Sequence, residues 1–287
     1  MRRWAKTAGG LGLLIAVIAL VGPRAALDGV RSVDTGSLAA GAAIAVVTTS
    51  AAAWRWRVVA RALGLELRWP TAVAEYYRSL FLNSVLPGGI VGDVDRGVRH
   101  GRAAEDLGVA LRSVVWERTC GQLVLMLATA VVLSAGARRW VPDVSTPILL
   151  VTAVLVAGTV IVLGIRRART LLVRDLRRLR APAVAVPALL ASGVVLAGHV
   201  ATFTVAARAV GVGADALHVA GLALPVLAIG GLPLNVAGWG PREGAAAWAF
   251  GAAGLGAPAG LAVAVAYGAI ALVATLPGAV LLLRRAS

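Results

Sequence analysis

Two stretches of the sequence combine glycine and proline with an asparagine, an acid and an arginine. The first reads Leu80-Phe-Leu-Asn83-Ser-Val-Leu-Pro87-Gly88-Gly89-Ile-Val-Gly92-Asp93-Val-Asp95-Arg96, and the second reads Leu232-Pro233-Leu-Asn235-Val-Ala-Gly238-Trp-Gly240-Pro241-Arg242-Glu243-Gly244. Arginine binds phosphate through a planar, bidentate fork. The first N–H groups of a helix also suit an anion. Since each stretch ends where a helix is predicted to start, the pattern indicates a binding site for an anionic group.

The composition places these stretches in a membrane protein. Of the 287 residues, 59% are apolar and 14% are charged, whereas a soluble domain has about 25% charged residues. Apolar runs recur along the whole chain, which excludes an enzyme whose catalytic domain lies in water. Basic residues outnumber acidic ones by 28 to 13. They fall between apolar spans, which indicates membrane topology and contact with anionic lipid rather than nucleic acid.

The two broken stretches lie about half a chain apart. Paired broken segments in corresponding halves of a membrane protein point to a transporter with internal repeats and a site between them. A short match of asparagine and glycines can also arise by chance, because glycine and proline are common in membrane helices. The neighbouring charges favour a function, since ions inside a membrane are costly and mark a substrate site by default.

A third group of charges, Arg112, Glu117 and Arg118, lies in a long apolar helix predicted from about 107 to 136. We expect these side chains to face the broken stretches. Adjacent residues on a helix do not face each other, so Glu117 and Arg118 should use different partners. The alternative is that all of these charges form internal ion pairs or reach the membrane surface.

Apolar runs predict membrane spans at about 8–22, 38–56, 107–136, 147–165, 182–210 and 216–232, followed by a short helix and a span, or one tight hairpin, over 245–283. Arginine collects at 1–6, 55–68, 96–102 and 166–180 and in the tail, which predicts that both termini are cytoplasmic. Because 55–68 and 96–102 then lie on one side, the stretch 80–92 must enter and leave by the same face. Such a re-entrant element is allowed only where protein or a wet cavity shields its backbone.

Two residue types outside the broken stretches have structural interpretations. His199 is a lone polar group on an apolar helix, and we expect a hydrogen-bonded structural histidine rather than a ligand or proton relay. Tryptophans near span ends are typical of anchors at the membrane surface; these are Trp54, Trp56, Trp69, Trp116 and Trp140. Trp239, between two glycines, is expected to pack the second broken stretch.

The sequence resembles the transmembrane flippase region of lysylphosphatidylglycerol synthases and its stand-alone, flippase-like (YbhN-type) relatives. The resemblance rests on Asn83…Leu86-Pro87-Gly88-Gly89-x-x-Gly92-Asp93-x-x-Arg96, on Glu117-Arg118, and on Leu232-Pro233…Gly238-x-Gly240-x-Arg242-Glu243. It implies an integral membrane protein that handles lipids with polar headgroups. The chain carries no soluble aminoacyl-transferase domain, so we do not expect it to synthesise the lipid. Asp95 and Pro241 depart from the family pattern.

We therefore predict one all-α domain over 1–287, with halves 1–136 and 147–287, and seven or eight membrane segments that include two broken or re-entrant elements in an inverted-repeat-like arrangement. The predicted function is translocation of a phospholipid or polyprenyl-linked lipid across the bacterial inner membrane, without a cofactor, a metal or enzymatic activity. The partners are membrane lipids, anionic or zwitterionic, and not nucleic acid; a homo-oligomer is left open. The alternatives are a membrane-embedded transferase that modifies lipids and a subunit that transports nothing.

The predicted substrate-binding residues have three roles. Arg96, Arg118 and Arg242 would hold phosphate. Asp93, Glu117 and Glu243 lie beside these arginines; Asp93 and Glu117 would hold arginines in place or bind an amine on the headgroup. The broken backbone would be shaped by Asn83, Gly88, Gly89, Asn235, Gly238 and Gly240.

Overall fold

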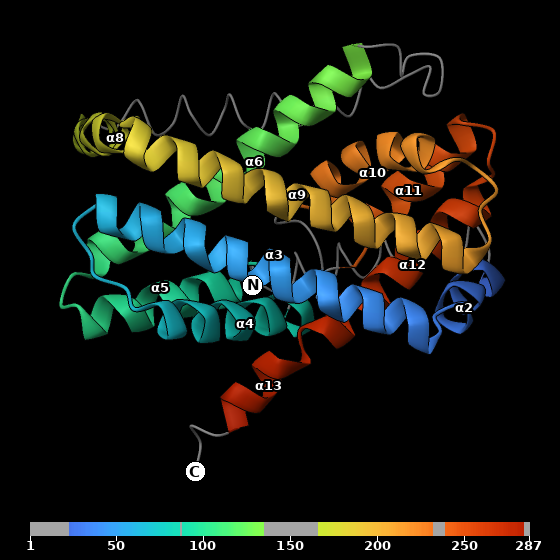
Figure 1. The fold of residues 1–287 in the computed structure, drawn as a ribbon, viewed down its shortest axis with the longest axis horizontal. Coiled ribbons are helices and arrows are strands. Elements are labelled where there is room, and N and C mark those ends of the chain that lie inside the picture. Colours follow the sequence, from blue (N-terminus) through green and yellow to red (C-terminus); the bar gives the residue numbers. More distant parts are fainter. Residues whose placement is uncertain (1–22, 87, 135–165, 232–238, 284–287) are drawn as a thin grey trace.

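The computed structural model describes residues 23–86, 88–134, 166–231 and 239–283, and its regular elements are all helices (Figure 1). They are α2 (Pro23–Arg31), α3 (Thr35–Ala62), α4 (Trp69–Val85), α5 (Val91–Ala103), α6 (Leu107–Ser134), α8 (Arg166–Leu179), α9 (Pro182–Val210), α10 (Ala216–Gly230), α11 (Pro241–Ala252), α12 (Ala257–Ala274) and α13 (Leu276–Leu283). The all-α prediction is confirmed. The spans predicted at 8–22 and 147–165 lie outside the described residues.

Within the described ranges, four helices are long and apolar enough to cross a membrane, namely Thr35–Ala62, Leu107–Val132, Pro182–Val210 and Ala257–Leu283. Each exceeds the roughly 20 residues that a hydrocarbon core of about 30 Å requires. The first three correspond to predicted spans, and the fourth follows the short helix α11. Of the two arrangements predicted for 245–283, the structure has the short helix and the span.

Local signals explain where the long helices begin and end. The Asp34 carboxylate accepts a hydrogen bond from the Ser37 backbone N–H at 2.7 Å, and the Ser37 hydroxyl accepts one from the Asp34 N–H at 3.0 Å. This reciprocal cap starts α3, and the Ser37 N–H lowers the pKa of Asp34. At the end of α9, Gly211 adopts a φ of 84°, which glycine reaches without a Cβ penalty.

Helices α4 and α5 form an antiparallel hairpin. Arg99 Nε lies 3.1 Å from a Glu75 carboxylate oxygen, and Arg78 Nε lies 3.0 Å from Asp95. A Cβ on Gly92 would lie 2.1 Å from the Ser79 carbonyl oxygen, so the two backbones touch where only glycine fits.

The break at the tip of this hairpin is shorter than the sequence suggested. Helix α4 continues to Val85, and the helix resumes at Val91. Leu86 is extended, with φ −102° and ψ 145°, because a following proline disfavours the helical conformation. Gly88 and Gly89 then take φ values of 97° and 61°, which turn the chain back.

Helices α10 and α11 form a second hairpin in the other half of the chain. We predicted a crossing at 216–232, but α10 has 15 residues and is about 22 Å long. It ends at Gly230, shorter than the roughly 20 residues that a full crossing requires, and α11 packs beside it, where a Cβ on Gly230 would lie 3.2 Å from that of Arg242.

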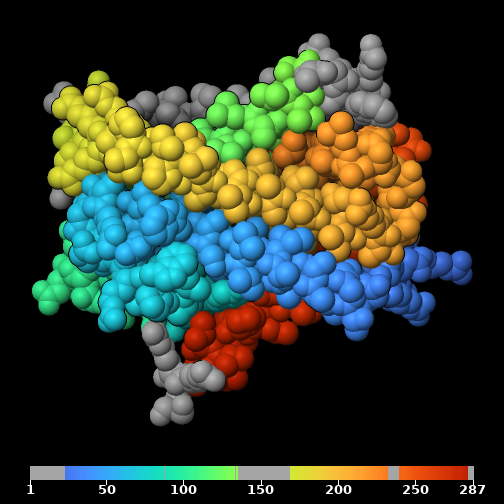
Figure 2. Space-filling view, viewed as in Figure 1, coloured from blue at the N-terminus to red at the C-terminus, as the bar shows by residue number. Residues whose placement is uncertain are grey.

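The two halves repeat the same order of elements: a long helix, a helical hairpin and a second long helix. The first long helices, α3 and α9, pack antiparallel along their length, since Arg55 contacts Ser192 and Thr48 lies against Gly198. Figure 2 shows the blue surface of α3 directly against the yellow surface of α9. As Figure 1 shows, the α4–α5 hairpin starts at the left end of α3 and the α10–α11 hairpin at the right end of α9.

The basic segments gather at one end of the helical bundle. Arg178, from the basic run at 166–180, donates to the Leu63 carbonyl oxygen at 3.2 Å. Arg112, near the start of α6, pairs with Asp175 of α8 at 2.8 Å. Of the segments predicted to share one side of the membrane, 55–68, 96–102 and 166–180 therefore lie at the same end of the bundle (Figure 1).

Candidate functional site

Glu117 is the centre of a buried charge network in the first half. Its carboxylate is fully buried and accepts hydrogen bonds from three helices. Arg55 of α3 donates from Nε at 2.9 Å and also from Nη2, Tyr76 of α4 donates from its hydroxyl at 3.0 Å, and Arg96 of α5 donates from Nη2 at 2.6 Å. One carboxylate thus ties α3, α4 and α5 to α6.

Asp93 is the second carboxylate of this network. It accepts from Ser79 Oγ and Asn83 Nδ2, each at 3.1 Å. Arg96 Nε donates to it at 3.1 Å and Arg118 Nη2 at 2.9 Å. The prediction that Glu117 and Arg118 use different partners is confirmed, and five predicted site residues lie in one network.

Three arginines share these two carboxylates, so the network carries one excess positive charge. Arg96 is fully buried, with its guanidinium 4.6 Å from the Trp56 ring centre and 4.4 Å from that of Tyr76. Stacking on aromatic rings stabilises a desolvated cation. The Arg118 side chain is 42% exposed, so of the cations bound to Asp93 it is the one that a ligand can reach.

Trp56 corrects the prediction of a surface anchor. It is fully buried and donates from Nε1 to Ser113 at 3.1 Å. Trp116 also turns inward, donating to Asp175 at 3.2 Å, whereas Trp54 is 43% exposed. A position near the end of a span does not determine whether a tryptophan ring faces the lipid or the protein interior. Trp140 lies outside the described residues.

The second half contributes an arginine held by its chain neighbour. Arg242 donates to Glu243 from Nε at 3.0 Å and from Nη2 at 2.5 Å. Glu243 also accepts from the Gly240 N–H at 2.6 Å. The Arg242 guanidinium lies 5.1 Å from the Tyr267 ring centre and 5.4 Å from that of Trp239. Trp239 packs this segment, as predicted.

Two backbone N–H groups at the helix starts have internal acceptors. The Gly92 N–H donates to Asn83 Oδ1 at 2.8 Å, and the Gly240 N–H donates to Glu243. We expected the helix starts at 91–96 and 242–245 to offer N–H groups to an anion, and for Gly92 the expectation is wrong, because Asn83 already accepts from its N–H. Any anion site here depends mainly on arginine.

A cavity of about 400 Å³ lies between the two halves. It is lined by Arg55, Gly89, Ile90, Asp93, Arg118, Gly121, Gln122, Leu125, Ser192, Val195, Leu196, His199, Leu227, Gly230, Gly231, Arg242 and Tyr267. Arg118 and Arg242, from opposite halves, face the same space. Gly121 and Leu196 lie near the midpoints of α6 and α9, so the cavity is close to the middle of the long helices.

The predicted site residues divide into lining and supporting groups. Gly89, Asp93, Arg118 and Arg242 line the cavity. Behind them, the charge network and the turns contain Asn83, Gly88, Arg96, Glu117, Gly240 and Glu243. Asn235 and Gly238 lie outside the described residues.

Sequence reasoning missed four polar residues of the cavity wall: Arg55, Gln122, Ser192 and Tyr267. Arg55 was interpreted as part of the basic end of a span, although it lies seven residues before the end of α3. This position within the helix was the signal that could have identified it as a site residue. Ser192 accepts a hydrogen bond from Arg55 Nη1 at 2.9 Å. The two residues are 137 positions apart in the sequence, and no local pattern predicts such a contact.

His199 has both a structural partner and a place at the cavity. Its Nδ1 lies 2.9 Å from the Tyr267 hydroxyl, so the predicted hydrogen-bonded histidine is confirmed. Since both residues line the cavity and come from α9 and α12, their bond also joins two walls of the site.

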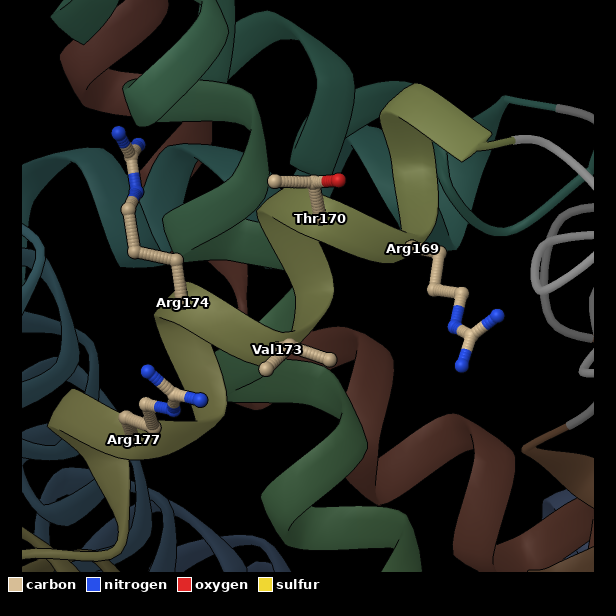
Figure 3. A pocket seen from close by; sticks show the side chains of 5 residues that line it. All are labelled: Arg169, Thr170, Val173, Arg174 and Arg177. Carbon is tan, nitrogen blue, oxygen red and sulfur yellow. The ribbon is translucent and has the colours of Figure 1, made fainter.

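A larger hollow, of about 730 Å³, lies along α8 (Figure 3). Its lining residues are Arg169, Thr170, Val173, Arg174 and Arg177, all from one helix. The Arg174 side chain is 52% exposed. Since the described lining of this hollow comes from one exposed helix, whereas the cavity between the halves is lined from several helices, the cavity between the halves is the better candidate site.

The model of one protein family matches residues 4–278, and its description is the transmembrane region of lysylphosphatidylglycerol synthase. The match covers nearly the whole chain, so the protein belongs to this family of membrane proteins associated with lipid handling. No curated protein and no solved structure matches the chain.

Proposed function

We propose that this protein translocates lipids with a phosphate-bearing polar headgroup across the bacterial inner membrane. The headgroup would enter the cavity between the halves while the acyl or prenyl tails stay in the bilayer. Arg118 and Arg242 would bind the phosphate from opposite sides. Arg96, Glu117 and Asp93 would hold Arg118 in position.

One observation carries the proposal: a polar cavity lies at mid-length of apolar helices and is faced by an arginine from each half. Ionisable groups at such depth are expensive and mark substrate pathways. The outer faces of the same helices are apolar, with Leu123 56% and Leu127 64% exposed on α6. A lipid therefore finds a surface for its tails beside a site for its headgroup.

The two hairpins support an alternating mechanism. We infer that they are re-entrant elements that enter from opposite faces, within an inverted repeat of seven or eight membrane segments. Gly89 and Ile90 from one tip and Gly230 and Gly231 from near the other line the same cavity. Non-helical backbone is tolerated at membrane depth where it borders a wet cavity, and in transporters such broken elements form the substrate site.

A flipping assay tests the proposed function. Purified protein is reconstituted into vesicles that contain fluorescent phospholipid in both leaflets, and the outer leaflet is bleached with dithionite. We expect the bleached fraction to exceed that of empty vesicles. Bleaching equal to that of empty vesicles would favour the subunit that transports nothing, and a chemically altered lipid recovered from the vesicles would favour the transferase.

Cysteine labelling tests the membrane arrangement. In protein with Cys120→Ser, single cysteines replace Glu66, between α3 and α4, and Leu217, at the start of α10, where the side chains are exposed. We expect a membrane-impermeant reagent to reach Leu217→Cys from the periplasm and Glu66→Cys and Arg174→Cys only after cell lysis, since basic segments favour the cytoplasm. Labelling of Glu66→Cys in intact cells would contradict this orientation.

A further inference from the structure

The three carboxylates of the two arginine clusters already have internal donors. Glu117 accepts from Arg55, Arg96 and Tyr76 and is fully buried. Glu243, also fully buried, accepts from Arg242 and from the Gly240 N–H. A carboxylate in this state has little capacity to bind a further cation.

Among the described residues that line the cavity, Asp93 is the one acid, and its two oxygens accept from four different side chains. Ser79, Asn83, Arg96 and Arg118 all donate to it, and it is 6% exposed. An ammonium group that approached Asp93 would have to displace Arg118, and it would enter a network that already has one excess positive charge.

The arginines, in contrast, keep unused N–H groups. Arg118 donates to Asp93 through Nη2, and Arg242 donates to Glu243 through Nε and Nη2. Within the described part of the chain, Nε of Arg118 is buried without an acceptor, and the 42% of the Arg118 side chain that is exposed faces the cavity. The cavity thus offers donors and positive charge, and among its described lining residues no acid that is unpaired.

From this asymmetry we infer that the site selects anionic phosphate headgroups that carry no amine, and that it disfavours aminoacylated and other amine-bearing lipids. The inference rests on the proposed function, whose substrate class it narrows. Phosphodiester and phosphomonoester headgroups share this chemistry. A headgroup ammonium would meet Arg118 and Arg242 with no unpaired carboxylate beside it, and like charges brought together in an interface are strongly disfavoured.

The test is a binding series on wild-type protein in detergent, read by native mass spectrometry. The lipids share short acyl chains and differ in headgroup: phosphatidylglycerol, phosphatidic acid, phosphatidylethanolamine and lysylphosphatidylglycerol. We expect the first two to bind at least about tenfold more tightly than the last two. Comparing the first two separates phosphodiester from phosphomonoester. Equal or tighter binding of lysylphosphatidylglycerol, or no binding of any lipid, would overturn the inference.

A matched pair of variants tests whether the selectivity for anionic lipids comes from the cavity or from the charge of the whole protein. Arg118→Gln should weaken phosphatidylglycerol binding by about tenfold or more, while Arg174→Gln, which removes the same charge on α8, should leave it unchanged. Equal effects of both would show that bulk charge, not the cavity, selects the lipid. If Arg118→Gln does not fold, the wild-type series decides alone.

The binding series tests the headgroup selectivity and the flipping assay tests transport, so one proposal can be refuted without the other. Anion-selective binding without lipid flipping would refute the proposed transport and leave the selectivity standing. Flipping at equal rates for phosphatidylglycerol and lysylphosphatidylglycerol would refute the selectivity and leave transport standing.

Discussion

The α4–α5 hairpin and the α10–α11 hairpin occupy equivalent places in the two halves, but different forces hold them. Charges join the first: Glu75 with Arg99, Arg78 with Asp95, and Asp93 with Arg118 of the next helix. The second packs through an apolar cluster that includes Leu222, Val226, Phe250 and Phe203. Each half nevertheless brings an arginine to the same cavity, Arg118 from α6 and Arg242 from α11.

The two halves also differ in how many donors support the carboxylate that binds the cavity arginine. Arg118 binds a carboxylate that has three other donors, Ser79, Asn83 and Arg96. Arg242 binds a carboxylate whose other donor, among the residues that the structure describes, is a single backbone N–H, that of Gly240. Asp93 therefore keeps three donors when Arg118 turns to a ligand, whereas the buried Glu243 depends on Arg242, whose side chain is only 11% exposed and leaves its partner at a higher cost.

The largest expected effect is on transport. Arg118→Ala and Arg242→Ala should each abolish lipid flipping, because each removes half of the phosphate site. Arg→Lys at either position keeps the charge but loses the bidentate fork, so it should slow flipping by about tenfold or more. Arg174→Ala, on exposed α8, should leave the rate unchanged. Wild-type rates in both alanine variants would show that these arginines serve topology alone.

The same two alanine variants should differ in stability. After Arg118→Ala, Asp93 keeps three donors, whereas after Arg242→Ala the buried Glu243 keeps one. Leaving a buried charge without its partner costs about 3–5 kcal/mol, so Arg242→Ala should lower the free energy of unfolding further than Arg118→Ala does. Unfolding in mixed detergent micelles measures both. The reverse order would contradict the contrast between the two hairpins.

Glu117→Ala should destabilise the protein more than Glu243→Ala. The first change leaves Arg55, which is 3% exposed, without a carboxylate and the fully buried Arg96 with Asp93 alone, at a cost of about 3–5 kcal/mol. The second releases only Arg242, which still faces the cavity. Glu66→Ala is the control, since its pair with Arg61 lies between side chains 87% and 46% exposed and should contribute below about 1 kcal/mol.

The smallest expected changes in the free energy of unfolding are those of two tyrosine-to-phenylalanine variants. Tyr76→Phe removes a bond to the Glu117 carboxylate, and bonds to charged groups contribute about 1.5–3 kcal/mol. Tyr267→Phe removes a bond to the His199 ring, and bonds between neutral groups contribute about 0.5–1.5 kcal/mol. Comparing the unfolding free energies checks the difference. Equal losses would mean that the network around Glu117 is no more strongly coupled than the second half.

Several site features were predictable because they are local. Proline after Leu86 and the glycines that follow predicted a break, and α5 begins at Val91 as expected. The long apolar runs predicted α6 and α9, with α9 running from Pro182 to Val210 as the pattern indicated. The inside placement of Trp56 was not predictable, because it depends on which neighbour the helix meets.

The sequence by itself determined the class of protein, the helices and the arginines that would be costly in a membrane, since hydropathy, proline and glycine act over short distances. Only the tertiary structure decided the partners: Arg55 with Glu117, His199 with Tyr267, and Arg118 facing the cavity that Arg242 also lines. The physical reason is that lipid-facing and protein-facing sides of a membrane helix are both apolar. No periodic pattern then marks the packed face, and long-range pairing is fixed by the contacts between helices.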